Sequence, residues 1–198
     1  VAPEPMYRHI WPYIKDDGRM PRKGRKTEPV TGPPEPPKEL EAALQSLYEN
    51  YRKTFDAWEN DADARSRGRT PPVFIIVCNN TSTSKLVYDY ISGFQREQED
   101  GTSTFENGRL ELFRNFDEHG NPFPRPNTLL IDSEQLESGE ALDDNFRGMA
   151  ADEIERFRRE IVERTGDQRQ AEGLTDQDLL REVMNTVGKH GRLGESIR

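Results

Sequence analysis

The feature that most constrains this fold is a short apolar run that leads directly into a helix signal. Residues 73–78 (VFIIVC) are uncharged and mostly β-branched or aromatic, and two prolines precede them. Those prolines exclude a helix on the N-terminal side. A run of this length without polar alternation is typical of a strand that is buried on both faces, as in a parallel sheet. We therefore predict a parallel strand at 73–78.

A polar turn and an amphipathic helix are expected to follow this strand. Asn79 and Asn80 end the apolar run, and the hydroxyl groups of residues 81–84 are candidate N-caps. Gly93 marks the expected end of the helix. Its apolar residues recur at helical spacing, at Leu86, Val87, Tyr90, Ile91 and Phe94. Strand, turn and helix form half of a βαβ unit, in which the turn lies where α/β proteins bind ligands.

The fold class predicted from these elements is α/β, with a parallel sheet and flanking helices. A second buried strand is expected at 127–132, a short edge strand at 110–113, and a polar excursion without regular structure at 95–108. Further helices are predicted at about 150–165 and from Thr175, where the spacing to Asp178 resembles a capping box.

The best-defined predicted helix covers residues 38–60. Its apolar residues recur every three or four positions and should dock on the domain that follows. They are Leu40, Leu44, Leu47, Tyr51, Phe55 and Trp58. We expect three regions: a basic, proline-rich arm at 1–37, a connecting segment with this amphipathic helix at 38–70, and the α/β portion at 71–198.

The arm carries a cluster of basic residues without an acidic neighbour. Such a cluster is either a contact for nucleic-acid phosphates or a solvated linker, and both interpretations stay open. The members that we consider as contacts are Arg22, Lys23, Arg25 and Lys26.

Composition narrows the class of protein. A formal net charge of -9 argues against the chain as a whole being a dedicated nucleic-acid binder. The single cysteine, Cys78, excludes an internal disulfide and fits a reducing compartment. No apolar run is long enough to span a membrane. We expect a cytoplasmic protein with no membrane partner. The histidines and Cys78 lack metal-ligand spacing, so we predict no metal site and no catalytic residue.

Four stretches resemble one known family. They are residues 72–88 (PVFIIVCNNTSTSKLVY), 116–120 (FDEHG), 127–141 (NTLLIDSEQLESGEA) and 194–198 (GESIR). Together they resemble the Res (restriction and helicase) subunit of type III restriction enzymes, a DEAD/DEAH-like helicase of superfamily 2. The likeness is spread over most of the chain, and the second and third stretches are specific to that family.

The resemblance implies a segment of an ATP-dependent DNA motor. Residues 71–198 would open the second RecA-like domain, with the strand at 73–78 and the following turn matching helicase motif IV. The implied partners are DNA and a modification methyltransferase subunit, and the full-length parent would use ATP and Mg²⁺. The chain does not begin with Met and contains no G-x-x-x-x-G-K-[ST] phosphate loop. We therefore expect a fragment that is inactive alone and uses no cofactor.

The candidate nucleic-acid contact is the turn that follows the predicted strand. Backbone amides, hydroxyl groups and a lysine ammonium at a helix N-terminus can hold a DNA phosphate. Ordinary N-capping is the alternative for the same residues. They are Asn79, Asn80, Thr81, Ser82, Thr83, Ser84 and Lys85.

Two further interpretations concern function. The sequence Asp117–Glu118–His119 resembles a DExH box, but no apolar strand precedes it, so a surface turn is predicted instead. A non-catalytic binding or scaffold module, which docks a partner through the helix at 38–60, remains the alternative to a motor segment.

Overall fold

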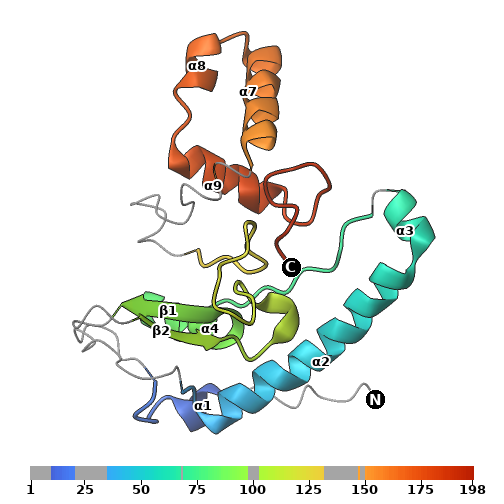
Figure 1. Ribbon diagram of the computed structural model, residues 1–198. Helices are drawn as coiled ribbons and strands as arrows, with labels where there is room; N and C mark the ends of the chain where they lie inside the picture. Colours follow the sequence, from blue (N-terminus) through green and yellow to red (C-terminus); the bar gives the residue numbers. More distant parts are fainter. Residues whose placement is uncertain (1–9, 21–34, 68, 98–102, 132–146, 148–149) are drawn as a thin grey trace.

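A computed structural model describes residues 10–20, 35–67, 69–97, 103–131, 147 and 150–198. Within these residues the protein is a mixed helical fold with one small antiparallel sheet of two strands (Figure 1). One core cluster joins the long N-terminal helix to the central helix, and a second lies among the C-terminal helices. The predicted parallel sheet is not formed in the described part of the chain.

Helix α2 (Lys38–Asn60) confirms the periodic pattern of the sequence. Its apolar face lies in the first core cluster, where Leu44 and Phe55 are each 3% exposed. One member of the predicted stripe is wrong, because Leu47 is 49% exposed and Tyr48 takes its place in the core. The short helices α1 (Trp11–Ile14) and α3 (Ala62–Ser66) lie against α2.

Helix α4 (Thr81–Ser92) packs against α2 through Val87, Tyr90 and Ile91 of the predicted stripe. The other two predicted members lie outside this cluster: Leu86 is half-buried, and Phe94 is buried but belongs to the strand that follows. Between the two helices lies the 3-10 helix η1 (Glu111–Phe113), whose Phe113 is 1% exposed. The Phe113 ring is 4.8 Å from that of Tyr51 and 5.4 Å from that of Tyr48, measured between centroids. The expected edge strand at 110–113 is therefore wrong: these residues turn inward to fill the core.

A β-hairpin follows α4 where the sequence suggested a polar excursion. Strand β1 (Gly93–Glu97) pairs antiparallel with β2 (Ser103–Asn107). Gly93 ends the helix as predicted, with a φ of 89° that disfavours other residues. Gly108 closes the hairpin against α4, and a side chain there would collide with the carbonyl oxygen of Ile91.

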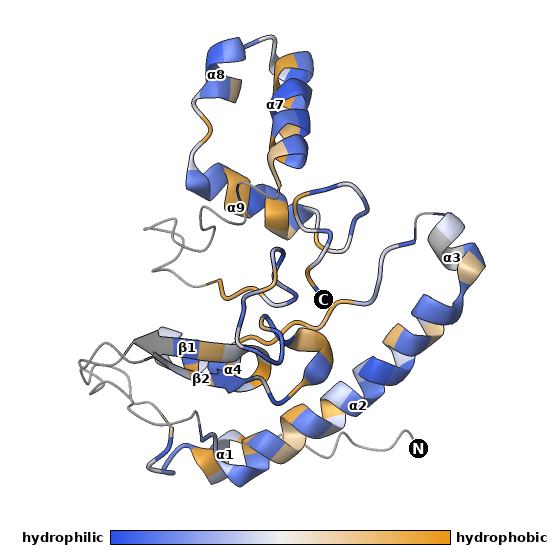
Figure 2. Ribbon diagram, viewed as in Figure 1, coloured by the Kyte–Doolittle hydropathy of each residue, from blue (hydrophilic) through white to orange (hydrophobic). Residues whose placement is uncertain are grey.

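Residues 73–78 are extended but have no strand partner. Phe74, Ile76 and Cys78 pack on the first core cluster, whereas Ile75 is 78% and Val77 is 90% exposed. The backbone of this segment makes no hydrogen bond to any residue that the structure describes. Figure 2 shows it as a hydrophobic coil that leads into α4. The segment has the shape and composition of the predicted strand, without its neighbours.

The second predicted strand also lacks a partner within the described residues. Residues 128–131 have no regular structure, and Asp132 lies outside the described part of the chain. Asn127 accepts a hydrogen bond from the backbone amide of Arg198 (2.9 Å). The guanidinium carbon of Arg198 in turn lies 4.9 Å from the ring centroid of Phe55.

Three helices form the C-terminal region: α7 (Ala151–Thr165), α8 (Gln168–Glu172) and α9 (Asp176–Asn185). Both helices predicted here are confirmed. The capping box at α9 is also confirmed, since Thr175 and Asp178 exchange side-chain and backbone hydrogen bonds. Their shared core includes Ile154, Leu180 and Val183.

Candidate functional site

The turn at residues 79–80 is closed by an asparagine. Asn80 has extended backbone angles, and its side-chain oxygen accepts a hydrogen bond from the amide of Thr83 (2.8 Å). Its side-chain nitrogen donates to Asn79 (2.9 Å). The N-cap of α4 is thus Asn80, one residue before the hydroxyl residues that the sequence analysis proposed.

The hydroxyl groups of the turn do not all face solvent. Ser84 donates its hydroxyl to the carbonyl oxygen of Thr81 (2.9 Å). Thr83 is 6% exposed, and its hydroxyl makes no hydrogen bond within the described residues. Thr81 is exposed and Ser82 is half-buried. An approaching phosphate would therefore meet mainly Thr81, Ser82 and the first amides of α4.

Lys85 is held by its own helix. Its ammonium nitrogen lies 2.7 Å from Oδ1 of Asp89 and 5.5 Å from the ring centroid of Tyr88. The Lys85 side chain is 58% exposed, whereas that of Asp89 is 2% exposed. The ammonium group is therefore anchored one turn further along α4, and it does not join the turn at 79–82.

Cys78 lies at the entrance to this turn. Its side chain is half-buried among apolar neighbours, and burial raises the pKa of its thiol. The thiol form is thus favoured at neutral pH, which suits a packing role better than a nucleophilic one.

The remaining sequence candidates lie elsewhere. Arg22, Lys23, Arg25 and Lys26 are outside the described residues. Asp117 begins a surface turn, as predicted. Its carboxylate accepts hydrogen bonds from the backbone amides of His119 (2.8 Å) and Asn121 (2.9 Å).

The hydrogen bonds of this surface turn also affect ionisation. The side-chain amide of Asn121 donates to Asp117 (2.9 Å), and this bond together with the backbone bonds lowers the pKa of the carboxyl group. The carboxylate therefore stabilises the turn, and none of the described strands leads into it as a DExH box would require.

The sequence pattern does not indicate the role of a buried asparagine next to the candidate site. Asn115 is 7% exposed, and its side chain donates to the hydroxyl of Tyr88 and to the carbonyl of Thr128, both at 2.9 Å. Its side-chain oxygen accepts from the amides of Asn127 (2.9 Å) and Thr128 (3.0 Å). Asn115 therefore links residues 127–128 to Tyr88 of α4 through hydrogen bonds. No local pattern could reveal this role, because its partners are distant in sequence.

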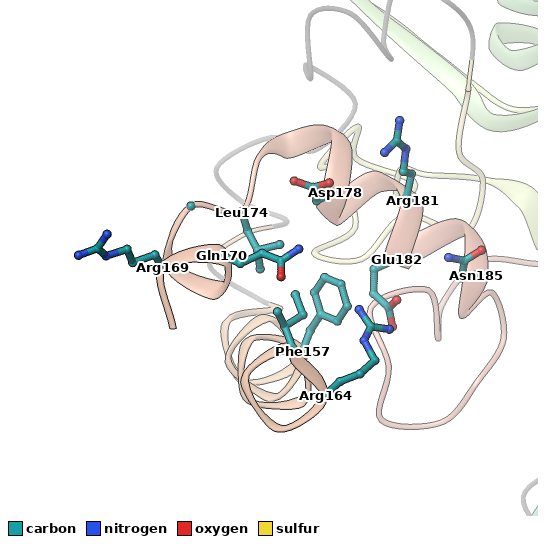
Figure 3. A pocket seen from close by; sticks show the side chains of 11 residues that line it. Phe157, Arg164, Arg169, Gln170, Leu174, Asp178, Arg181, Glu182 and Asn185 are labelled. Carbon is teal, nitrogen blue, oxygen red and sulfur yellow. The ribbon is translucent and has the colours of Figure 1, made fainter. Parts of the chain in front are cut away.

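A cavity of about 370 Å³ lies between α7, α8 and α9, away from the turn (Figure 3). Apolar, amide and charged side chains line it together. The lining residues are Phe157, Ile161, Arg164, Arg169, Gln170, Gly173, Leu174, Asp178, Arg181, Glu182 and Asn185.

The described part of the chain offers neither a cluster of metal ligands nor a helix that could cross a membrane. Those residues contain no group of three or more His, Cys, Asp or Glu side chains that could hold a metal ion. None of their helices combines the length and hydropathy that crossing a membrane requires.

Comparison with protein-family models finds no matching family, and comparisons with curated proteins and with solved structures find no match.

Proposed function

We propose that this chain is a segment of the ATP-dependent helicase motor of a type III restriction enzyme acting on DNA. The observation that carries the proposal is the extended segment at 73–78, which leads into a capped helix. One apolar face of this segment is exposed to solvent, and its backbone forms no hydrogen bond with the described residues. A strand of this kind fits a larger parallel sheet whose other strands cover it. The four stretches that resemble the Res subunit indicate that this sheet would be the first part of a second RecA-like domain.

In this proposal the turn after the strand contacts the DNA backbone. The first amides of α4 and the hydroxyl groups of Thr81 and Ser82 supply neutral donors at the positive end of the helix dipole. Lys85 supplies a nearby charge, although Asp89 shares it. Contacts of this type hold phosphates and carry no sequence specificity. The proposal also includes a modification methyltransferase subunit as partner and a cytoplasmic location.

Nucleotide chemistry is assigned to other parts of the parent enzyme. The sequence has no phosphate loop, and the described residues offer no cluster of metal ligands. The described residues therefore do not fit ATP with Mg²⁺, and we derive no catalytic step from them. The chain alone is expected to have neither ATPase nor nuclease activity.

The alternative, a scaffold module that binds a partner through α2, has less support. Most of the apolar stripe of α2 is already covered by α4, η1 and residues 74–78. Leu47 is the large apolar residue of α2 that stays exposed, and a single such residue does not make a docking surface.

The substitution Val77→Lys tests the motor proposal. In the 198-residue chain Val77 is 90% exposed, so the charge should change stability by less than about 0.5 kcal/mol. In the longer parent protein a neighbouring strand or helix would cover this position, so the same substitution should abolish folding and DNA-stimulated ATPase activity.

Phe74→Ala is the matched control for this experiment. Phe74 is an apolar residue of the same segment that faces the core, so its loss should destabilise both proteins. If the parent protein tolerates Val77→Lys as well as the short chain does, no sheet covers this segment and the proposal is wrong.

A further inference from the structure

The cavity between α7, α8 and α9 opens to solvent on one side. Small-molecule sites of this kind measure roughly 300–1,000 Å³. The cavity volume of about 370 Å³ falls within that range.

One wall of the cavity is apolar. Phe157 and Ile161 come from α7, and Leu174 precedes α9. Ile161 is 4% exposed, whereas Phe157 and Leu174 are half-buried and remain accessible from the cavity. Figure 3 shows the Phe157 ring between the helices, with the side-chain amide of Gln170 facing the same space. A flat apolar group could stack on this ring.

Arginine supplies the cationic part of the lining. The guanidinium groups of Arg164, Arg169 and Arg181 form no ion pair and no hydrogen bond with any described residue. Figure 3 shows Arg164 rising from α7 beside Phe157 toward Glu182, while Arg169 and Arg181 extend outward at the rim. A guanidinium group with unused donors matches the oxygens of a carboxylate or a phosphate.

Two acidic residues of the lining carry the opposite charge. The carboxylate of Asp178 accepts hydrogen bonds from the amide (3.0 Å) and the hydroxyl (2.7 Å) of Thr175, and these bonds lower the pKa of its carboxyl group. Burial raises the pKa of Glu182, against the charges of Arg192, Lys189 and Arg164 and together with the charge of Glu160. Arg164 and Glu182 form no ion pair in the described structure. Because the lining holds three arginines and two carboxylates, an excess of positive charge remains.

We propose that this cavity binds a small organic anion that has a flat apolar body and one phosphate or carboxylate group. Arg164 binds the oxyanion, and Phe157 and Leu174 contact the body. This site goes beyond the proposed motor function and does not depend on it.

The experiment titrates the 198-residue chain with phenyl phosphate, benzoate and benzyl alcohol while amide chemical shifts are recorded by NMR. The first two probes share a ring and differ in the anion, and the third lacks the charge. We expect saturable shifts around the cavity with a Kd on the order of 1 mM for the better anion, and at least about tenfold weaker binding of benzyl alcohol.

Three variants test which side chains bind or repel the anion. Arg164→Gln should weaken anion binding about tenfold, and Glu182→Gln should strengthen it about threefold by removing the opposing charge. Arg159→Gln should have no effect, because Arg159 is exposed on the same helix and does not line the cavity.

The gain in anion affinity expected for Glu182→Gln cannot result from unfolding. This variant therefore tests the proposal even if Arg164→Gln fails to fold. Absence of saturable shifts would overturn the proposal. So would equal binding of benzyl alcohol, or equal losses in the Arg164 and Arg159 variants.

Discussion

The ammonium nitrogen of Lys85 lies 2.7 Å from a carboxylate oxygen of Asp89, whose side chain is 2% exposed. The pair thus joins a solvent-facing lysine to a buried acid on the same face of α4. Because a buried carboxylate needs compensating partners, the lysine contributes to folding whether or not it meets DNA. Replacing Lys85 therefore tests two roles at once, and the structural role has to be measured first.

Lys85→Met should lower the free energy of unfolding by about 1–2 kcal/mol, because Asp89 loses one of its partners inside the protein. Chemical denaturation of the 198-residue chain measures this loss. Asp89→Asn in the same background completes a double-mutant cycle, and the double variant should lose less than the sum of the two single variants. Strict additivity would show that the pair is not coupled.

Phe55→Ala should cost about 3–5 kcal/mol, because the Phe55 side chain is 3% exposed in the first core cluster. Leu47→Ala, on the same helix, should cost less than about 0.5 kcal/mol because Leu47 is 49% exposed. Thermal or chemical unfolding of both variants makes the comparison. Similar losses at the two positions would mean that α2 turns a different face to the core.

Alkaline pH should destabilise the protein through two tyrosines. Burial raises the pKa of Tyr51 to about 12 against the opposing charge of Arg198, and burial with a hydrogen bond to Glu41 raises the pKa of Tyr90 to about 12. The folded state therefore keeps these protons where the unfolded state, with a pKa of 10, has lost them. The stabilisation is present below about pH 10 and is lost as the pH rises towards 12.

Denaturation curves at several pH values, with tyrosinate absorbance recorded in parallel, measure this loss. Tyr51→Phe should make the decline in stability above about pH 10 shallower, because one of the two groups no longer ionises. A decline that is unchanged in this variant would assign the effect to other groups.

Elements whose signals are local could be predicted from the sequence. The helix at 38–60 follows from apolar spacing alone, and α9 follows from a capping box in which Asp178 lies three residues after Thr175. Leu47 shows the limit of such patterns. Helical periodicity identifies an apolar face, but the partner surface decides which edge of that face is buried.

Elements that depend on distant partners could not be predicted in the same way. The hairpin of β1 and β2 has little apolar content, and it is held by backbone pairing and by the close approach of Gly108 to α4. Residues 73–78 adopt the expected extended shape, yet pairing needs a second strand that no local pattern supplies. Residues 111–113 form η1 because Phe113 fills a gap between α2 and α4.

The position of the turn at 79–85 could be predicted but its details could not, and its contact with DNA stays a prediction. The turn does follow the apolar run and does begin a helix, as strand-to-helix chemistry requires. Asn80 is the cap because its short amide reaches the amide of Thr83 from an extended backbone, which a hydroxyl one residue later could not do. The spacing of Lys85 and Asp89 is visible in the sequence, but the burial of Asp89 is set by tertiary packing.

Asn80→Asp separates the two roles of the turn. Aspartate caps helices as well as asparagine does and favours the positive end of the helix dipole, but it cannot donate the hydrogen bond to Asn79. Stability should therefore change by less than about 1 kcal/mol in either direction. In the longer parent protein, the new negative charge would lie beside the phosphates that we propose at this turn. DNA binding at low salt should then weaken about fivefold for all sequences alike. Asn80→Ala gives the contrasting case, because losing the cap costs about 0.5–2 kcal/mol without adding charge. Unchanged DNA affinity in a folded Asn80→Asp protein would leave this turn as a helix cap and nothing more.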